Sequence, residues 1–508
     1  MVASDSKRIA KNSLYLYIRL GIGLIVSLYT SRIILEALGV VDLGIYNVIG
    51  SITSMFTWLS ASLSNATQRY LNFELGQQNY IKLKKVFQQS LIIFLIFALI
   101  AGIFVMLGGL WLIHHKLNIP TNRLNAATWV LFATAFTMTI TLIASVFDAV
   151  LIARENMKVY AYVGLSDVIL RLVIVFLLLI LPGDRLIWYA ILLMLLLSIS
   201  KAIPITYSIR KYSECKIQFI WEKKLIKEMA GFTGWNTLGI IVYIFNNQGI
   251  DVLLNMFFGP TVNAAKSISN QVQHAVTNLS SGFYTAVRPQ LIKSYAVGNF
   301  NYLFTLLFHS TKYLIFLVGT FILPIILRVN NILDIWLTII PTNTDQFIIW
   351  ILIFVLINTF SEPLSTTAQA SGKQRKYILS GNAVYVSVFP LSYLAFKLGY
   401  PPVTAFKILV FIRIIYVTVI LFVINSYVEF GIYNYLKRVV LPILYVAIIA
   451  IPISISLNNY IPQNFGGLVL FGILSILTTT ITICCFGLTS SERIIVMNKI
   501  KSYVVKNN

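Results

Sequence analysis

KKVFQQSLIIFLIFALIAGIFVMLGGLWLIHHK, residues 84–116, holds no charged side chain between Lys85 and Lys116. The hydrocarbon core of a bilayer is about 30 Å thick, so a helix needs about 20 apolar residues to cross it. Residues 87–113 meet this length, and comparable apolar runs recur from about residue 12 to about residue 490. The sequence therefore predicts an all-α polytopic membrane protein.

Working outward from this segment, we predict about 14 transmembrane helices. The composition agrees, because only 11% of the residues are charged, whereas soluble domains carry about 25%. The predicted spans are 12–34, 43–66, 87–113, 125–147, 160–182, 186–209, 230–258, 262–287, 303–327, 346–368, 377–397, 403–426, 439–457 and 466–487.

Lys and Arg in the connecting segments alternate between the two sides of the membrane. One side carries 26 of them, including both termini, and the other carries four: Lys116, Arg123, Arg185 and Arg328. Because basic residues are retained in the cytoplasm, this asymmetry predicts that both termini are cytoplasmic.

The net charge of +22 does not indicate a nucleic-acid partner, because the basic residues are spread over many short loops. Their expected contacts are anionic lipid headgroups. Cys215 lies in a cytoplasmic loop and Cys484–Cys485 in the last span, so neither a disulfide nor a metal site is expected. Gly372-Lys373 lacks the rest of a phosphate-binding loop, and we predict no nucleotide or other cofactor.

The chain repeats itself at an offset of 220 residues. Leu38-Gly39 corresponds to Phe258-Gly259, and Gln78-Asn79-Tyr80 corresponds to Gly298-Asn299-Phe300. A second match, at an offset of 217, pairs residues 160–164 with 377–381. Six spans in each half make the two repeats parallel. We therefore predict two six-helix lobes around a central cleft: an N-lobe (1–209), a linker with a possible surface helix (210–229), a C-lobe (230–426), two extra helices (427–490) and a cytoplasmic tail (491–508).

Polar residues inside a membrane must face protein or water. The span 262–287 places Lys266, Asn270 and Gln273 on one helical face, at steps of four and three. Interhelical hydrogen bonding is the ordinary role of small polar residues in a bundle. For Lys266, Asn270 and Gln273 we favour a place in the cleft, where they would bind the substrate.

Charges within the other spans complete the candidate site. A charged side chain at the bilayer centre costs at least ~2.5–3.5 kcal/mol, so each one needs a partner or a use. Asp167 and Arg171, four residues apart, are predicted to pair, as a structural or a functional ion pair. Asp251 and Glu362 are candidate proton or sodium sites, with neutralisation of nearby basic residues as the equal alternative. Basic candidates outnumber acidic ones, which favours an anionic substrate; they are Arg19, Arg171, Lys266, Lys312 and Arg413.

Three segments resemble the bacterial polysaccharide-unit (Wzx-type, O-antigen) flippases. They are SRIILEALGVVDLGIYN at 31–47, AVLIARENMKVY at 149–160 and ASGKQRKY at 370–377. The resemblance spans nearly the whole chain, but its motifs mark the family better than the substrate. It implies the fold of the multidrug/oligosaccharidyl-lipid/polysaccharide flippase superfamily and a location in the bacterial inner membrane.

The resemblance also implies a cargo, an oligosaccharide on undecaprenyl pyrophosphate that moves from the cytoplasmic to the periplasmic leaflet. Polysaccharide assembly proteins are possible partners. In the similar lipid II flippases the last two helices form a groove for the lipid tail, and residues 439–487 are expected to do likewise. The alternatives are a lipid II flippase, a multidrug or cation antiporter and a polysaccharide polymerase or ligase. An enzyme is disfavoured because the periplasmic loops near 114–124 and 328–345 are short and lack a carboxylate cluster beyond Asp334 and Asp345.

Overall fold

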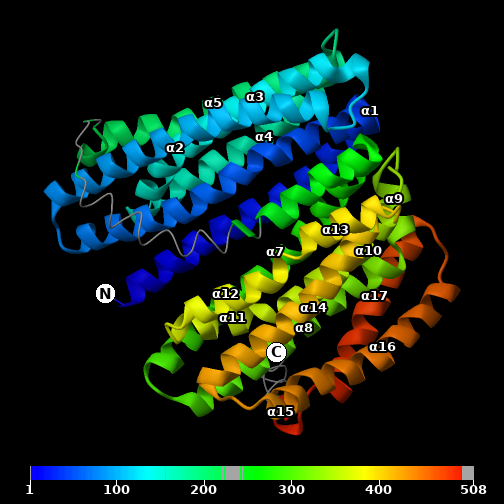
Figure 1. The fold of residues 1–508 in the computed structure, drawn as a ribbon. Coiled ribbons are helices and arrows are strands. Elements are labelled where there is room, and N and C mark those ends of the chain that lie inside the picture. The colour runs from blue at the N-terminus through cyan, green and yellow to red at the C-terminus, as the bar shows by residue number, and fades with distance from the viewer. Residues whose placement is uncertain are drawn as a thin grey trace, which may run out of the picture. The chain divides into compact units, whose positions relative to one another are not determined.

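The computed structural model describes residues 2–154, 156–216, 218, 222, 241–242 and 244–494, and every regular element in these residues is helical. Figure 1 shows the long helices that result. In the first half they are α1 (Val2–Gly76), α2 (Tyr80–His115), η1 (Thr121–Arg123), α3 (Leu124–Ala153), α4 (Met157–Ile180), α5 (Arg185–Lys211) and η2 (Ser213–Cys215).

Residues 244–258 are also helical. The remaining elements are α7 (Pro260–Ala296), α8 (Phe300–Leu327), α9 (Val329–Trp336), α10 (Thr344–Thr359), α11 (Ser361–Ala370), α12 (Gln374–Tyr385), α13 (Val388–Lys397), α14 (Thr404–Val428), α15 (Ile432–Tyr435), η3 (Leu436–Val440), α16 (Leu441–Tyr460), α17 (Phe465–Thr482) and η4 (Ile483–Gly487).

Eleven helices in the described part of the chain are long and apolar enough to cross a membrane. The chain is therefore a multi-pass membrane protein, but the predicted count of 14 is not confirmed. Three predicted spans account for the difference. The spans 12–34 and 43–66 are joined in α1, 230–258 lies partly outside the described residues, and 262–287 falls in the polar helix α7.

Contacts divide the chain into two compact units. Unit 1 comprises Met1–Ile268 and Phe389–Pro402, and unit 2 comprises Ser269–Val388 and Val403–Asn508. In unit 1, α3 packs against α1, α2 and α5. Small residues such as Ala98 and Ala101 of α2 and Ala127 of α3 are buried there and let the helix backbones approach closely.

Arg123, which the sequence indicated only as a marker of topology, joins Asp42 of α1 to Asp184 at the start of α5. Its guanidinium donates to Asp42 Oδ1 at 2.8 Å and to Asp184 Oδ2 at 2.6 Å. Burial alone raises the pKa of Asp184, but hydrogen bonds from Arg123 and from the first amides of α5 hold this pKa below its usual range. The group therefore stabilises the fold above the usual aspartate pKa and loses this effect as the pH falls below it.

The two halves share local backbone features at the offset of 220 residues. Gly39 interrupts α1 with a φ of 77°, and Gly259 precedes α7 with a φ of 82°. This left-handed region is accessible to glycine without the steric cost that a Cβ atom adds. The Asn79 and Asn299 side chains likewise cap α2 and α8 by accepting hydrogen bonds from Lys82 N and Tyr302 N. The sequence matches thus correspond to matched helix boundaries.

In unit 2, α14 packs against α10 and α12, and α8 packs against α10, α16 and α17 (Figure 1). Phe316 of α8 is buried against Val446 and Ala450 of α16. At the far end of α8, Arg328 is 2% exposed and donates to the carbonyl oxygens of Asn458, in the last turn of α16, and of Ile461 and Pro462, in the loop that follows. The two extra helices are therefore fastened to α8.

The predicted linker 210–229 begins as a continuation of α5, followed by η2. The Gln88 side chain donates to Lys216 O at 2.6 Å and accepts from Gln218 N at 2.9 Å. These two hydrogen bonds attach Lys216 and Gln218, which follow η2, to α2. The predicted surface helix, including Trp221, lies mostly outside the described residues, as does most of the tail 491–508.

Cys215 should be inert to thiol reagents in the folded protein. Its side chain is fully buried, and burial, with a smaller contribution from Glu214, raises the thiol pKa to about 12. The reactive thiolate is therefore nearly absent at pH 7 to 8. Maleimide labelling of a variant with Cys484 and Cys485 replaced by Ser should require denaturant. Labelling of the native protein within minutes would contradict this packing.

Candidate functional site

A buried ion pair occupies the helix pair formed by residues 244–258 and α7 in unit 1. Lys266 Nζ lies 3.0 Å from Asp251 Oδ1 and donates to Asn247 O at 2.7 Å. Asn263 Nδ2 donates to Asp251 O at 2.7 Å. Lys266 and Asp251 are 6% and 9% exposed, so the pair is shielded from solvent and lipid.

The turn at Gly259 explains this pairing. Asp251 and Lys266 lie eight residues before and seven residues after Gly259, so two helices that meet at this turn bring them opposite each other. From the sequence, Lys266 was a candidate substrate ligand, and Asp251 was either an ion site or the counter-charge of a nearby basic residue. The structure pairs the two residues, as the second reading of Asp251 expects, and Lys266 is not an unpaired cation.

A second buried polar cluster surrounds Arg413 of α14 in unit 2. Arg413 is 8% exposed, and its Nη2 donates to Asn358 Oδ1 and, at 2.9 Å, to Ser361 Oγ. Its Nε is buried without a hydrogen-bond partner. No carboxylate lies within ion-pair distance of it in the described part of unit 2, so this cation is held by neutral groups.

Aromatic rings enclose the Arg413 guanidinium. Its central carbon lies 4.2 Å from the ring centroid of Tyr416, 5.5 Å from that of Tyr385 and 5.7 Å from that of Phe354. The hydroxyl groups of Tyr416 and Tyr377 lie 3.1 Å apart. Cation–π contacts partly compensate a buried guanidinium without neutralising it. The cluster therefore keeps a positive charge among flat rings and hydroxyl groups.

Glu362, a predicted ion site, lies in the first turn of α11 beside this cluster. The helix breaks at Phe360, between α10 and α11, as expected a few residues before Pro363, which cannot donate a backbone hydrogen bond. Glu362 Oε2 is buried without a hydrogen-bond partner, and the charge of Arg413 acts on this carboxyl group. Tyr284 of α7 donates to Glu362 O at 2.8 Å. The structure thus places Glu362 and Arg413 in one cluster.

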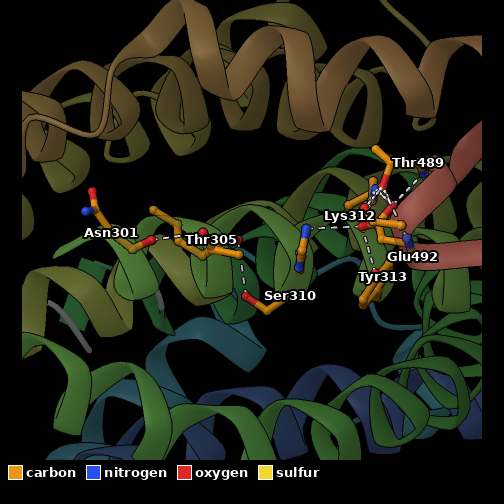
Figure 2. A network of polar contacts seen from close by, with 10 residues as sticks. Asn301, Thr305, Ser310, Lys312, Tyr313, Thr489 and Glu492 are labelled. Carbon is orange, nitrogen blue, oxygen red and sulfur yellow. Dashed lines mark hydrogen bonds and ion pairs between the residues drawn. The ribbon is translucent and has the colours of Figure 1, made fainter. Parts of the chain in front are cut away.

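The other predicted residues lie elsewhere. Lys312 does not face a cavity as an unpaired cation, because it forms an ion pair with Glu492 beyond α17 (Figure 2). Asn270 and Gln273 are half-buried on α7. The side chain of Arg19 lies outside the described residues.

The predicted pair of Asp167 and Arg171 does not form. Asp167 Oδ1 is buried without a hydrogen-bond partner. Arg171 is exposed on α4, and its charge acts on Tyr46 and Tyr189 instead. A spacing of four residues permits such a pair but does not impose it.

Residues 20–177 match the MatE family. Two solved structures align over most of the chain. An inward-facing multidrug resistance MATE family transporter of the MOP superfamily is 14% identical, with a TM-score of 0.67, and the alignment covers 81% of this chain and 98% of that one. The lipid II flippase MurJ, in an inward closed conformation, is 14% identical with a TM-score of 0.71, over 92% and 98% of the two chains.

The chain has the MOP-superfamily fold. A MOP superfamily transporter from Pyrococcus furiosus agrees, at 13% identity and a TM-score of 0.59, over 83% of this chain and 96% of that one. No curated protein matches the sequence. At such identities these matches show the fold, and they leave the role and the substrate open.

Proposed function

We propose that this chain is an alternating-access flippase of the bacterial inner membrane, with both termini in the cytoplasm. Its cargo is an oligosaccharide unit on undecaprenyl pyrophosphate, of the O-antigen or capsule type, which it moves from the cytoplasmic to the periplasmic leaflet. The observation that carries this proposal is the buried Arg413, a cation that neutral groups hold.

The chemistry of the Arg413 cluster suits a phosphorylated sugar carrier. A guanidinium forms paired hydrogen bonds with phosphate oxygens, and its Nε is available for one of them. The rings of Tyr385 and Tyr416 offer apolar faces to sugars, and their hydroxyl groups can bond sugar hydroxyls. Because Arg413 is buried here, the cargo reaches it only after a conformational change that opens unit 2, as alternating access requires.

Glu362 is the residue that would couple cargo movement to a proton or sodium ion. Its carboxyl group lies near enough to Arg413 for that charge to act on it, but outside ion-pair distance. A pyrophosphate at Arg413 would offset the guanidinium charge, so that a Glu362 carboxylate would then need another counter-ion, a proton or a sodium ion. Asp251 is less suited to this role, because Lys266 already neutralises it.

An apolar groove in unit 2 supports a lipid-linked cargo. It has a volume of about 640 Å³ and lies between α7, α8 and α17. Its walls include Phe283, Phe316, Phe321 and Ile476. An isoprenoid chain buries its apolar surface in such a groove. The MurJ alignment also extends over more of this chain than the two transporter alignments do.

Transport of a fluorescent undecaprenyl-pyrophosphate oligosaccharide by proteoliposomes tests the proposal. We expect this cargo to reach the opposite leaflet faster than in protein-free vesicles, and an imposed proton or sodium gradient to change the rate. Uptake of a cationic dye is the comparison, because a buried Arg repels cations. Dye uptake without movement of the lipid-linked sugar would favour a multidrug or cation antiporter instead.

A further inference from the structure

The Glu492 carboxylate lies in a pocket of hydrogen-bond donors on unit 2 (Figure 2). Lys312 Nζ lies 2.8 Å and 2.7 Å from its two oxygens. The Tyr313 hydroxyl donates to Oε1 at 2.8 Å, and the backbone N–H and hydroxyl of Thr489 donate to Oε2 at 2.7 and 2.9 Å. His309 Nε2 lies 3.2 Å from Oε1. Both carboxylate oxygens are thus enclosed by donors, as in a protein site for an anion.

The pocket holds its anion in the charged form. Burial by itself raises the pKa of Glu492, but hydrogen bonds from Lys312, Thr489 and Tyr313 lower it to about 2. The carboxylate is therefore ionised at neutral pH. Its contribution to stability is present above the usual glutamate pKa and is lost only as the pH falls toward 2.

Charges around the pocket are mainly positive. Lys312 is 2% exposed, Arg438 acts on His309, and Arg493 donates to Leu488 O at 3.1 Å. Glu492 is the acidic partner in both ion pairs that this cluster forms within the described residues. An anion with more than one negative charge, such as a phosphate monoester, matches this surplus better than one carboxylate does.

The pocket opens into the apolar groove. Tyr313 and Glu492 line the groove of about 640 Å³ together with Leu317, Ile483 and other apolar residues. An occupant with a negative head and an apolar tail therefore meets donors at one end and hydrocarbon along its length. A free anion would use only the pocket, and an uncharged lipid would use only the groove.

We propose that this pocket is a binding site for the phosphate of an anionic membrane lipid, and that Glu492 occupies it as an internal competitor. Lys312, Tyr313 and His309 bind the phosphate after the segment that carries Glu492 withdraws. The lipid chains then fill the groove. This inference concerns a lipid of the surrounding membrane, which would occupy the groove while no isoprenoid chain of a cargo lies there. It stands whether or not the cargo is a lipid-linked oligosaccharide.

Titrating the purified full-length protein with dioleoyl phosphatidic acid, read by native mass spectrometry, tests the site. Glu492→Gln removes the competing charge and should tighten binding about tenfold, since a charge-assisted hydrogen bond contributes more than a neutral one. Glu492→Asp keeps the charge on a shorter side chain and should give a smaller gain. Lys312→Gln should weaken binding at least about tenfold.

The controls separate the possible sources of binding. Glu429→Gln removes an exposed carboxylate of unit 2 and should leave the affinity unchanged. Dioleoylglycerol should bind wild type and Glu492→Gln alike, and inorganic phosphate should bind both far more weakly than the lipid. Equal or weaker phosphatidic acid binding by monodisperse Glu492→Gln and Glu492→Asp proteins would overturn the proposal. So would tight binding of inorganic phosphate alone.

Discussion

Replacing Arg413 with Gln should reduce transport of the lipid-linked oligosaccharide at least about 100-fold. Gln can still bond Asn358 and Ser361, so the packing of α14 is retained, but the positive charge is lost. Paired charge-assisted hydrogen bonds to a phosphate contribute about 1.5–3 kcal/mol each, and 1.4 kcal/mol corresponds to tenfold. The rate of cargo movement in proteoliposomes at matched protein density measures the effect.

Two further variants show whether the loss of transport comes from the missing charge of Arg413. Arg413→Lys should retain part of the activity, because an ammonium group keeps the charge but lacks the planar fork. Lys407→Gln removes a cation from the same helix, where it lies over the ring of Trp350, and should leave transport nearly unchanged. Full transport by Arg413→Gln would exclude Arg413 as a cargo ligand.

Lys266→Met should destabilise the protein by about 3–5 kcal/mol, because it leaves the buried Asp251 carboxylate without a counter-charge. The double substitution Lys266→Met with Asp251→Leu removes both charges and should recover most of that loss. Denaturant or thermal unfolding of the purified protein measures the free energy. Additive losses in the double variant would show that the two residues are not coupled.

The Lys201–Asp148 pair of unit 1 is the matched control. Its atoms lie 3.0 Å apart, as in the Lys266 pair, but its side chains are 21% and 19% exposed. The same cycle of substitutions should therefore give an interaction energy between the two residues of only about 1 kcal/mol or less.

The double variant at positions 251 and 266 also tests which carboxylate couples transport to an ion gradient. If its transport still responds to an imposed gradient, the coupling carboxylate lies elsewhere, as the proposal for Glu362 requires.

The fold was largely predictable because membrane helices follow simple physical rules. Apolar length indicated spans, and the spacing of Gly39 and Gly259 indicated the repeat before their backbone angles were known. The span count was less certain for a physical reason. Gly39 joins two helices without a polar loop, and α7 is polar along one face, so neither follows the hydropathy rule.

The site was predicted in its residue types but not in its pairings. Arg413 and Glu362 were named because charges inside spans are costly, and the structure places them in one cluster. The pairing of Lys312 was missed because its partner, Glu492, lies 180 residues away, beyond the last span. Tyr416 and Tyr377 were missed because tyrosine is common at membrane interfaces, and no spacing distinguishes a ring over a guanidinium.

The anchoring of Arg328 has a consequence for how the chain is made. Its acceptor Ile461 follows it by 133 residues, which a ribosome adds in roughly 7–27 s at about 5–20 residues per second. During that interval the guanidinium has none of these three carbonyl partners and must stay hydrated at the membrane surface. The end of α8 can therefore reach this arrangement only after α16 and the residues up to Pro462 have been synthesised. A nascent chain that stops before them would present an exposed cation to the proteases that survey membrane proteins.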